Sequence, residues 1–287
     1  MINRNKLRER REKMKQKEYL VTGATGKTGR RVVSQLRERG ASVRAASRSS
    51  ATRFDWQDPS SWQAALAGTE GVYLVVPDDP ELIKSFVWAM ENADVAKVVL
   101  LSARAVGKEH VFAQAMLAAE QAVKQSSLDW TILRPNNFMQ NFDEDLWQPA
   151  IKAGRLGLPT AGLPEPFIDT EDIAAVAATA LLEDGHGSRT YELSGREAIT
   201  WAEATEAMAE AAGHPVDFEE LSPEAYLQEV AEEGYDSDSI AVVDSLFAAL
   251  RTGKSAPVST AVQDILGREP ISFRDFARKA AAAGAWS

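Results

Sequence analysis

Residues 23–29 read "GATGKTG", and this stretch decides the fold. A loop that binds nucleoside triphosphates, Gly-x-x-x-x-Gly-Lys-[Ser/Thr], would need its first glycine at position 21, which is Val21. The glycines instead follow a Gly-x-x-Gly-x-x-Gly spacing, which is related to the dinucleotide-binding turn. Gly23 can make the tight turn, Gly26 lets the backbone approach a phosphate, and Gly29 lets the next helix pack closely on the strand. We therefore predict a pyrophosphate site.

The position of this loop in the chain strengthens the prediction. Residues 19–22 form a short apolar run typical of a buried strand, and residues 28–39 follow with helical spacing. A pyrophosphate between such a strand and helix meets free N–H groups and the positive end of the helix dipole. Arg30 adds positive charge nearby. We expect the cofactor to contact six residues of the loop: Gly23, Thr25, Gly26, Lys27, Thr28 and Gly29.

Apolar runs and helical patterns alternate through the first half of the chain. The predicted strands are residues 19–22, 42–47, 71–76, 97–102 and 130–135. The predicted helices are residues 28–39, 59–67, 80–92 and 107–125. This alternation predicts an α/β fold, with right-handed βαβ units forming a doubly wound parallel Rossmann sheet.

The second half of the chain differs from the first in composition and in predicted secondary structure. Residues 136–168 are rich in loops and prolines, and a helix over 172–183 and a strand over 189–195 follow. The remainder is acidic and mostly helical. We predict a basic leader without fixed structure (1–18), an NAD(P)-binding Rossmann domain (19–155), and a smaller, mostly helical substrate region (156–287) that is partly interleaved with the Rossmann core. The acidic run 169–172 predicts a helix cap.

Composition narrows the class of protein. The chain has no cysteine, and its three histidines lie far apart, so we expect neither disulfides nor a metal site. No apolar run is long enough to span a membrane, and we expect a cytoplasmic protein. The leader carries eight Lys/Arg and three Asp/Glu, which leaves about −15 for the rest of a chain of net charge −10. Such a negative charge on the rest of the chain disfavours binding to nucleic acid. Met14 is an alternative start, which would leave residues 1–13 outside the native protein.

The end of the second predicted strand indicates which nicotinamide cofactor binds. NAD sites favour a carboxylate there, but none occurs between Gly40 and Asp55. A carboxylate about 4 Å from a 2′-phosphate would cost on the order of 4 kcal/mol at an effective dielectric near 20. Arg48 can pair with that phosphate, and Ser47 and Ser49 can donate hydroxyl hydrogen bonds. We therefore favour NADP(H) over NAD(H); the alternative is a solvated loop arginine.

Several segments together resemble one known family. "VTGATGKTG", "RAASRS", "FDWQDPSSWQAALAGTEGVYLVVP", "VVLLSA", "AAEQAVKQSSLDWTILRPNNFMQNF" and "PFIDTEDIAAVAATALLED" are similar to the NmrA-like branch of the atypical short-chain dehydrogenases/reductases. The resemblance covers residues 19–195. It implies a Rossmann fold, NADP or NAD in a cleft, and a small C-terminal substrate region.

The resemblance also implies positions for further cofactor contacts. Asp55 and Trp56 would contact adenine, Val76 and Pro77 would lie beside its ribose, and Pro135, Asn136 and Asn137 would lie near the nicotinamide. This sequence departs from the family at one point on the adenine side. Only about seven residues separate Arg48 from Asp55, so the usual intervening helix is expected to be absent.

A larger departure concerns the proton donor. Active members of the wider superfamily carry Tyr-x-x-x-Lys, with a glutamate four residues after the lysine. Aligning that glutamate with Glu120 places Phe112 at the tyrosine and Met116 at the lysine. Neither side chain can transfer a proton, and losing a positioned general acid typically costs about 10²- to 10⁴-fold in rate. Ordinary ketone reduction is therefore not expected.

Three hypotheses follow. The chain could be an NADPH-dependent reductase of a small aromatic or conjugated acceptor (a quinone, iminium or enone) that needs no protein acid. It could instead bind NADP(H) without turnover, as a redox sensor that reports to a regulatory protein partner. In the third hypothesis another side chain replaces the acid, and the candidates are Ser102, His110 and Tyr226. Ser102 ends a predicted strand, where it is also a candidate cofactor contact. His110 lies two residues before Phe112 and so on a different helix face.

The candidate substrate contacts are apolar. Phe138, Met139, Phe142, Trp147 and Phe167 could enclose a planar small-molecule substrate. The alternative is ordinary packing between the two regions of the chain, since Phe142, Leu146 and Trp147 have helical spacing. We favour the reductase over the sensor, and we leave open whether the chain forms a homo-oligomer.

Overall fold

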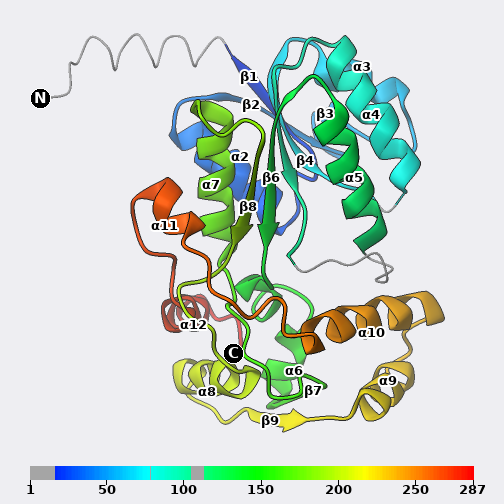
Figure 1. Cartoon of the computed structure of the whole chain (residues 1–287). Coiled ribbons are helices and arrows are strands. Elements are labelled where there is room, and N and C mark those ends of the chain that lie inside the picture. Colours follow the sequence, from blue (N-terminus) through cyan, green and yellow to red (C-terminus); the bar gives the residue numbers. More distant parts are fainter. Residues whose placement is uncertain (1–16, 78, 105–112) are drawn as a thin grey trace, which may run out of the picture. The chain divides into compact units, whose positions relative to one another are not determined.

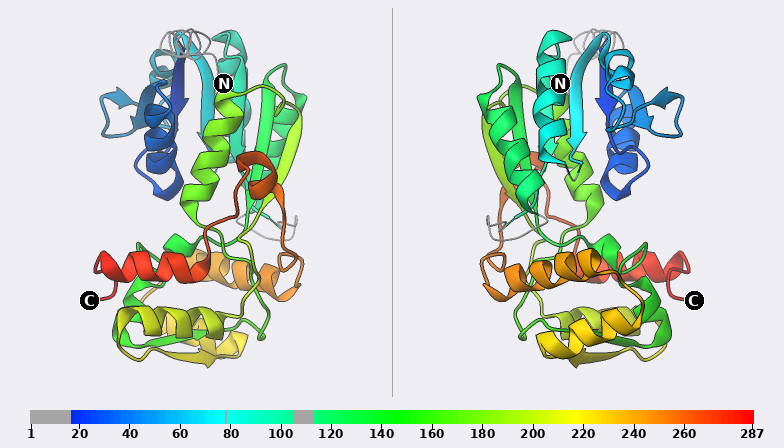
Figure 2. Two further views of the ribbon diagram at one scale, coloured as in Figure 1. Left: turned by 90° about the vertical axis from the view of Figure 1, so that its left-hand side faces the viewer. Right: turned by 90° about the vertical axis from the view of Figure 1, so that its right-hand side faces the viewer.

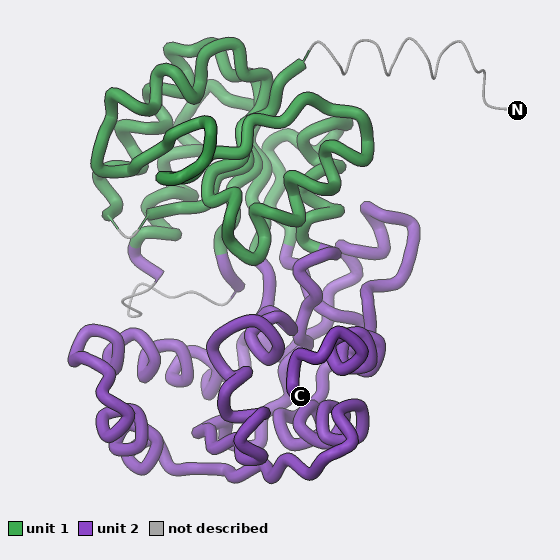
Figure 3. Tube along the Cα trace, turned by 180° about the vertical axis from the view of Figure 1, so that it is seen from behind, with its two compact units in different colours: residues 1–102, 115–134, 173–191 green, residues 103–114, 135–172, 192–287 purple. Residues whose placement is uncertain are grey.

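The computed structural model describes residues 17–77, 79–104 and 113–287, which form two compact units (Figure 3). Unit 1 contains the chain up to Ser102, Ala115–Arg134 and Ile173–Tyr191. Unit 2 contains Ala103–Gln114, Pro135–Asp172 and Glu192–Ser287. Each unit is therefore assembled from three separate segments. The functional division at residue 155 stays a prediction, and most of the basic leader lies outside the described residues.

A seven-stranded sheet forms the centre of unit 1 (Figure 1). Its order is β3-β2-β1-β4-β5-β6-β8, with the strands β1 (Glu18–Val21), β2 (Ser42–Ser47), β3 (Thr52–Arg53), β4 (Thr69–Val75), β5 (Lys97–Leu101), β6 (Asp129–Pro135) and β8 (Arg189–Leu193). Neighbouring strands run parallel, and the order reverses direction between β1 and β4. The predicted doubly wound Rossmann sheet is confirmed.

Helices cover both faces of this sheet. Figures 1 and 2 show α2 (Lys27–Glu38) and α7 (Thr170–Leu182) on one face. The opposite face carries α3 (Ser60–Leu66), α4 (Pro80–Asn92) and α5 (Ala113–Gln125). Side chains from these three helices and from the sheet form one apolar core, which includes Trp62, Phe86, Val123, Leu74 and Leu100. The strands read as continuous apolar runs because both of their faces are buried.

The connection between β2 and β3 is unusually short. A parallel crossover normally needs a dozen or more residues, but here only residues 48–51 separate the two strands. The Ser50 hydroxyl accepts from Ser47 N at 2.8 Å and donates to Thr52 O at 2.7 Å, so one side chain closes the turn. The helix usual at this point is absent, as the sequence predicted. The two-residue strand β3 was not predicted.

Unit 2 is mostly helical, which confirms the expectation for the C-terminal region. Its elements are η1 (Met139–Asn141), α6 (Gln148–Ala153), β7 (Arg155–Leu158), α8 (Trp201–Ala212), β9 (Asp217–Glu220), α9 (Pro223–Glu232), α10 (Ser237–Arg251), α11 (Ala261–Leu266) and α12 (Phe273–Ala282). Strands β7 and β9 pair in parallel, and an aromatic core includes Phe142, Trp201 and Phe273. Among the described residues, no helix has the length and apolar character needed to cross a membrane.

Candidate cofactor-binding site

The glycine loop between β1 and α2 has three distinct backbone requirements. Gly23 adopts a φ of +60°, which favours glycine. A Cβ on Gly29 would lie 2.1 Å from the carbonyl oxygen of Gly23, so only glycine lets α2 approach the turn this closely. A Cβ on Gly26 would meet only that same oxygen, at 3.3 Å, and would otherwise point into open space. Packing within the protein therefore does not require glycine at position 26. This is expected if a ligand approaches the backbone at Gly26.

The N-terminus of α2 is available to an anion. Gly26 is its N-cap residue and supplies no side-chain hydrogen bond, and no acidic residue occupies the first turn. Thr25 and Gly26 are exposed, Lys27 is half-buried, and Thr28 is buried. Free N–H groups, a helix dipole and the Lys27 ammonium together match the chemistry of a pyrophosphate. The loop thus fits the dinucleotide that the sequence predicts.

A buried threonine fixes the loop to the sheet at the point where the strand order reverses. Thr22 donates its hydroxyl to Tyr73 O at 3.2 Å and accepts from Val75 N at 2.9 Å, which joins the end of β1 to β4. Ala24 N donates to Ala46 O at 3.2 Å, which joins the loop to β2. Ligands of doubly wound folds bind at this reversal of strand order, outside the carboxyl ends of the strands. Thr22 was not singled out from the sequence, because its position in the motif carries no fixed residue type.

The segment after β2 presents a cation to solvent. Arg48 is exposed, and among the described residues its guanidinium makes no ion pair. The Ser47 hydroxyl accepts from Ser49 N at 3.3 Å. Arg53, at the end of β3, is already paired with Asp58 at 2.6 Å and lies 3.7 Å from Asp55. Of these two arginines, Arg48 is the one free to pair with a phosphate.

The predicted adenine contacts lie on a rigid support. Asp55 N donates to Ser61 Oγ at 3.1 Å, and Asp55 O accepts from Trp62 Nε1 at 2.9 Å. Trp56 is half-buried and packs edge-on against Phe86, with ring centroids 5.0 Å apart. Val76 and Pro77, which follow β4, are also half-buried. The contacts of these four residues with adenosine stay predictions.

A charge cluster around the buried Glu120 lies behind the carboxyl end of β5 in unit 1. Glu120, on α5, is 3 % exposed and accepts from Ser102 Oγ at 2.8 Å and from Arg134 Nε at 2.7 Å. Lys124 also donates to it, at 3.0 Å. Burial alone would raise the pKa of Glu120, but the hydrogen bonds from Arg134, Ser102 and Lys124 outweigh burial and lower it to about 2. Glu120 is therefore a carboxylate at neutral pH.

This cluster determines what Ser102 can do chemically. An ionised carboxylate only accepts hydrogen bonds, so the Ser102 hydroxyl directs its proton toward Glu120. Its oxygen lone pairs remain available as acceptors. Met116 is half-buried on α5, whereas His110 and Phe112 lie outside the described residues. Ser102 thus suits accepting a hydrogen bond from a ligand and does not suit supplying a proton.

Three buried tyrosines, Tyr19, Tyr73 and Tyr226, are also poor proton donors. Tyr226 packs on Phe247 in the core of unit 2, with ring centroids 5.1 Å apart. Burial, and then the nearby Tyr235 hydroxyl and acidic side chains, raise the pKa of Tyr226 above its usual value. Burial likewise raises the pKa of Tyr73, and it raises that of Tyr19 to about 12. A catalytic tyrosine needs the opposite shift, toward neutral pH.

A buried polar network in unit 2 holds the residues that follow β6. Asn136 is 4 % exposed, donates to Glu165 Oε1 at 2.7 Å and to Ser255 O at 3.0 Å, and accepts from Arg104 Nη1 at 2.9 Å. Ser255 Oγ donates to Glu165 Oε2 at 2.8 Å. Asn137 N lies 3.4 Å from Glu165 Oε1. Both donors of the Asn136 amide are therefore occupied by protein, and its side chain joins three segments.

Sequence reasoning missed this network. Glu165, between two prolines, has no local feature that separates it from a solvated loop carboxylate, and Arg104 and Ser255 lie in segments without periodicity. Their partners are distant in sequence, so only the folded chain shows them together. Pro135 is buried beside the network, and its contact with the nicotinamide stays a prediction, as do those of Asn136 and Asn137.

The candidate substrate residues mostly belong to the core of unit 2. Met139, Phe142, Trp147 and Phe167 are 0–3 % exposed. Phe142 contacts the rings of Trp147, Phe167, Trp201 and Phe273 at centroid distances of 4.9–5.7 Å. Packing within unit 2 accounts for the burial of these four side chains without a substrate. Phe138 is the one of the five that is only half-buried, and its contact with a substrate stays a prediction.

The acidic run at the start of α7 has the cap geometry that its sequence predicts. Asp169 is buried, and its Oδ1 accepts from Glu171 N at 2.8 Å and from Gln140 Nε2 at 2.9 Å. A capping carboxylate satisfies a free N–H group and complements the helix dipole. Within residues 17–77, 79–104 and 113–287, no group of three His, Cys, Asp or Glu side chains could hold a metal ion.

Comparisons with known proteins agree with this geometry. A family model described as NAD(P)H-binding matches residues 23–184. An uncharacterised oxidoreductase, YesF, from Bacillus subtilis is 33 % identical over 96 % of this chain and 98 % of its own length. The (4-alkanoyl-5-oxo-2,5-dihydrofuran-3-yl)methyl phosphate reductase of Streptomyces griseus is 32 % identical over 92 % of this chain and 98 % of its own.

A solved structure shares the fold over nearly the whole chain. The NADPH-dependent quinone oxidoreductase QOR2 of Escherichia coli, complexed with NADPH, superposes with a TM-score of 0.78 at 18 % identity, covering 91 % of this chain and 99 % of its own. The glycine turn, the sheet order and these matches agree with one another. The chain belongs to the NAD(P)H-binding, NmrA-like family of atypical short-chain dehydrogenases/reductases, and it is an NAD(P)H-dependent oxidoreductase.

Proposed function

We propose that this chain uses NADPH to reduce small conjugated acceptors, such as quinones, iminium ions or enones, without a side chain as proton donor. The observation that carries the proposal is the hydrogen bond from Ser102 Oγ to the ionised Glu120. It directs the Ser102 proton away from any ligand. Tyr226, the other described candidate, is buried in an aromatic core.

The choice of acceptor follows from the missing acid. When bound, the nicotinamide supplies a hydride, which carries two electrons. A ketone would become a strongly basic alkoxide and needs an acid at that moment, whereas an iminium ion becomes a neutral amine. A quinone becomes a stabilised hydroquinone anion, which water can protonate. The names of the relatives, a quinone oxidoreductase and a reductase of an unsaturated lactone, support this class of acceptor.

Turnover experiments on the full chain should separate these acceptors. We expect bound NADPH to lose its near-ultraviolet absorbance with quinones or iminium ions, and at least about 100-fold more slowly with simple ketones. Tyr226→Phe should change the quinone rate less than about threefold, because the Tyr226 hydroxyl does not donate the proton. Stopped-flow absorbance measures each rate. Fast ketone reduction that Tyr226→Phe abolishes would contradict the proposal; tight NADPH binding without oxidation by any acceptor would favour the sensor hypothesis.

The preference for NADPH depends on Arg48. Its exposed guanidinium follows β2, and no carboxylate precedes Asp55 in that segment. We expect Arg48→Ala to raise the Kd of NADPH by about 10- to 100-fold and to leave that of NADH almost unchanged, because only NADPH carries the 2′-phosphate. Calorimetry measures both constants. Arg274→Ala removes the same charge from an exposed position on α12 and is the control; equal losses in both variants would contradict the role of Arg48.

A further inference from the structure

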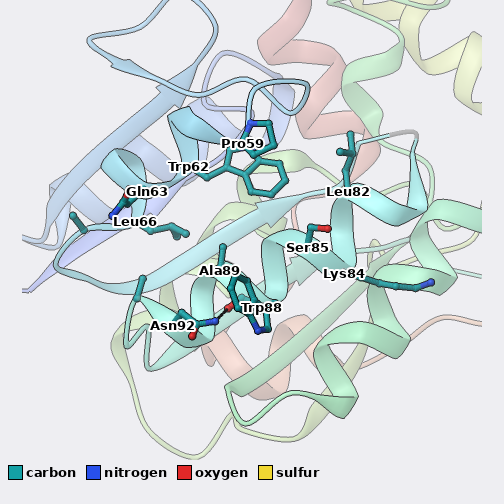
Figure 4. A pocket seen from close by; sticks show the side chains of 12 residues that line it. Pro59, Trp62, Gln63, Leu66, Leu82, Lys84, Ser85, Trp88, Ala89 and Asn92 are labelled. Atoms are coloured by element: carbon teal, nitrogen blue, oxygen red, sulfur yellow. Dashed lines mark hydrogen bonds between the residues drawn. The ribbon is translucent and has the colours of Figure 1, made fainter.

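The outer surface of α3 and α4 in unit 1 carries a large apolar hollow (Figure 4). Its volume is about 930 Å³. Trp62 and Leu66 line it from α3, and Leu82, Trp88 and Ala89 line it from α4. None of its lining residues is a predicted cofactor contact. The hollow is therefore a second feature of unit 1, which cofactor binding does not explain.

Trp88 is the most exposed large apolar side chain among the described residues. It is 67 % exposed, although a tryptophan on a soluble monomer is normally at least half covered. Trp62, in contrast, is 4 % exposed and held by its hydrogen bond to Asp55 O at 2.9 Å. The hollow thus has a fixed aromatic floor on α3 and a projecting aromatic ring on α4. A free tryptophan beside an apolar hollow is typical of a contact surface.

The charge of the hollow indicates the kind of occupant. Lys84 is the only charged residue among the twelve that line it, whereas 26 % of the whole chain is charged. Depletion of charge and enrichment in aromatic residues distinguish the core of a protein interface. Lys84 itself pairs with Glu81 at 2.7 Å, and both side chains are well exposed. A nucleotide or polar metabolite would find few partners on this surface.

We propose that a second copy of this chain docks here across a two-fold axis, each copy placing Trp88 in the hollow of the other. An isologous interface requires one patch to supply both complementary shapes, and this patch holds a projecting ring and an apolar hollow together. Ala67, Ala89 and Ala93 each contribute only a methyl side chain to the lining, which leaves room for a large side chain. The absence of carboxylates from the lining favours association of two chains that each carry a net charge of −10.

Sedimentation velocity on the full chain tests the proposal. We expect a concentration-dependent dimer, and we expect Trp88→Ala to raise its dissociation constant by about 10³-fold. A hot-spot tryptophan costs at least about 30-fold, and each substitution occurs twice in a two-fold interface. Trp88→Glu should give a monomer, because each copy would bury a carboxylate in the apolar hollow of the other. Tyr235→Ala, at an aromatic residue 42 % exposed in unit 2, should leave the dimer unchanged. Circular dichroism should show native helix content in all three variants.

Salt provides an independent measurement. Two copies with like net charge repel at long range, so raising ionic strength from about 50 to about 500 mM should tighten an apolar interface by screening that repulsion. An interface made of ion pairs would weaken instead, and that result would contradict this surface.

Two other outcomes would overturn the proposal. One is a wild-type chain that stays monomeric up to about 100 μM, since a specific interface forms below that concentration. The other is a dimer that survives Trp88→Glu. If a monomeric chain binds one molecule of the anionic probe anilinonaphthalene sulfonate, and Trp88→Ala removes that binding, the hollow is a small-molecule site.

Discussion

Gly29→Ala should lower the free energy of unfolding by about 3 kcal/mol or more. The added Cβ would lie 2.1 Å from Gly23 O and 2.8 Å from Gly23 C. Both are backbone atoms, so no side chain can move aside. The helix α2 would have to shift away from β1, and with it the N–H groups that we predict to bind the pyrophosphate. Urea unfolding monitored by tryptophan fluorescence measures the change.

Gly26→Ala is the matched substitution in the same loop, and its effect should be of a different kind. The added Cβ would meet only Gly23 O, at 3.3 Å, and the φ of Gly26 is −77°, which any residue adopts. We expect the free energy of unfolding to change by less than about 1 kcal/mol. NADPH affinity should nevertheless fall by at least about 100-fold, because the methyl group occupies the corner where backbone meets phosphate. Calorimetry of the folded variant measures that loss.

The pair of variants separates packing from binding. If Gly26→Ala binds NADPH like the wild type, the pyrophosphate does not lie against this corner, and the cofactor assignment of the loop is wrong. If Gly29→Ala is as stable as the wild type, the close approach of α2 to the turn is wrong. Either result leaves the sheet order intact, since the strand registers do not depend on the loop.

The sequence predicted those parts of the fold that depend on neighbouring residues. The helix Pro80–Asn92 and the strand Ser42–Ser47 occur with the expected bounds. Asp79 caps that helix by accepting from Glu81 N at 2.9 Å, and Pro80 begins it, so the residues that start the helix are adjacent in sequence. The glycine loop is equally local. Each of these elements could be predicted because the residues that determine it lie next to one another in the chain.

Elements that depend on distant partners were missed. The strands Arg155–Leu158 and Asp217–Glu220 pair with each other across more than 50 residues, and each has only four residues. Neither shows an apolar alternation strong enough to predict a strand. The buried partners of Asn136 were missed for the same reason, because Glu165 and Ser255 lie in separate loops. These strands and this network are determined by contacts between residues far apart in the sequence. A short stretch of sequence contains only one partner of each contact, so it cannot predict them.

Glu120→Gln should destabilise the chain by about 3 kcal/mol at pH 7, because it removes the charge that pairs with Arg134 and Lys124 behind Ser102. Glutamine has almost the same shape as glutamate, so no cavity forms and its carbonyl can still accept from Ser102. The loss therefore measures electrostatics and not packing. Glu210→Gln removes one partner of an exposed ion pair with Arg274 and should cost less than about 0.5 kcal/mol, which makes it the matched control.

The pH dependence of this effect has a defined sign. Folding lowers the pKa of Glu120 from its ordinary 4.5 to about 2, so the folded state favours the ionised form. A carboxyl group with a depressed folded pKa contributes stability that is complete above its unfolded pKa and is lost as pH falls toward the folded pKa. A shift of this size corresponds to about 3 kcal/mol. The difference between wild type and Glu120→Gln should be constant from pH 8 to about 5 and should shrink steadily below pH 4.5.

Urea unfolding at a series of pH values measures this difference. Glu120 is the carboxylate that pairs with both Arg134 and Lys124, so the series follows the loss of its charge. A difference that persists unchanged at pH 3 would mean that glutamine perturbs packing. If Glu120→Gln lowers the free energy of unfolding by no more than Glu210→Gln does, water screens the charges of the cluster. In that case Ser102 would no longer be bound to a buried ionised carboxylate, and its hydroxyl would be free to donate a proton to a substrate.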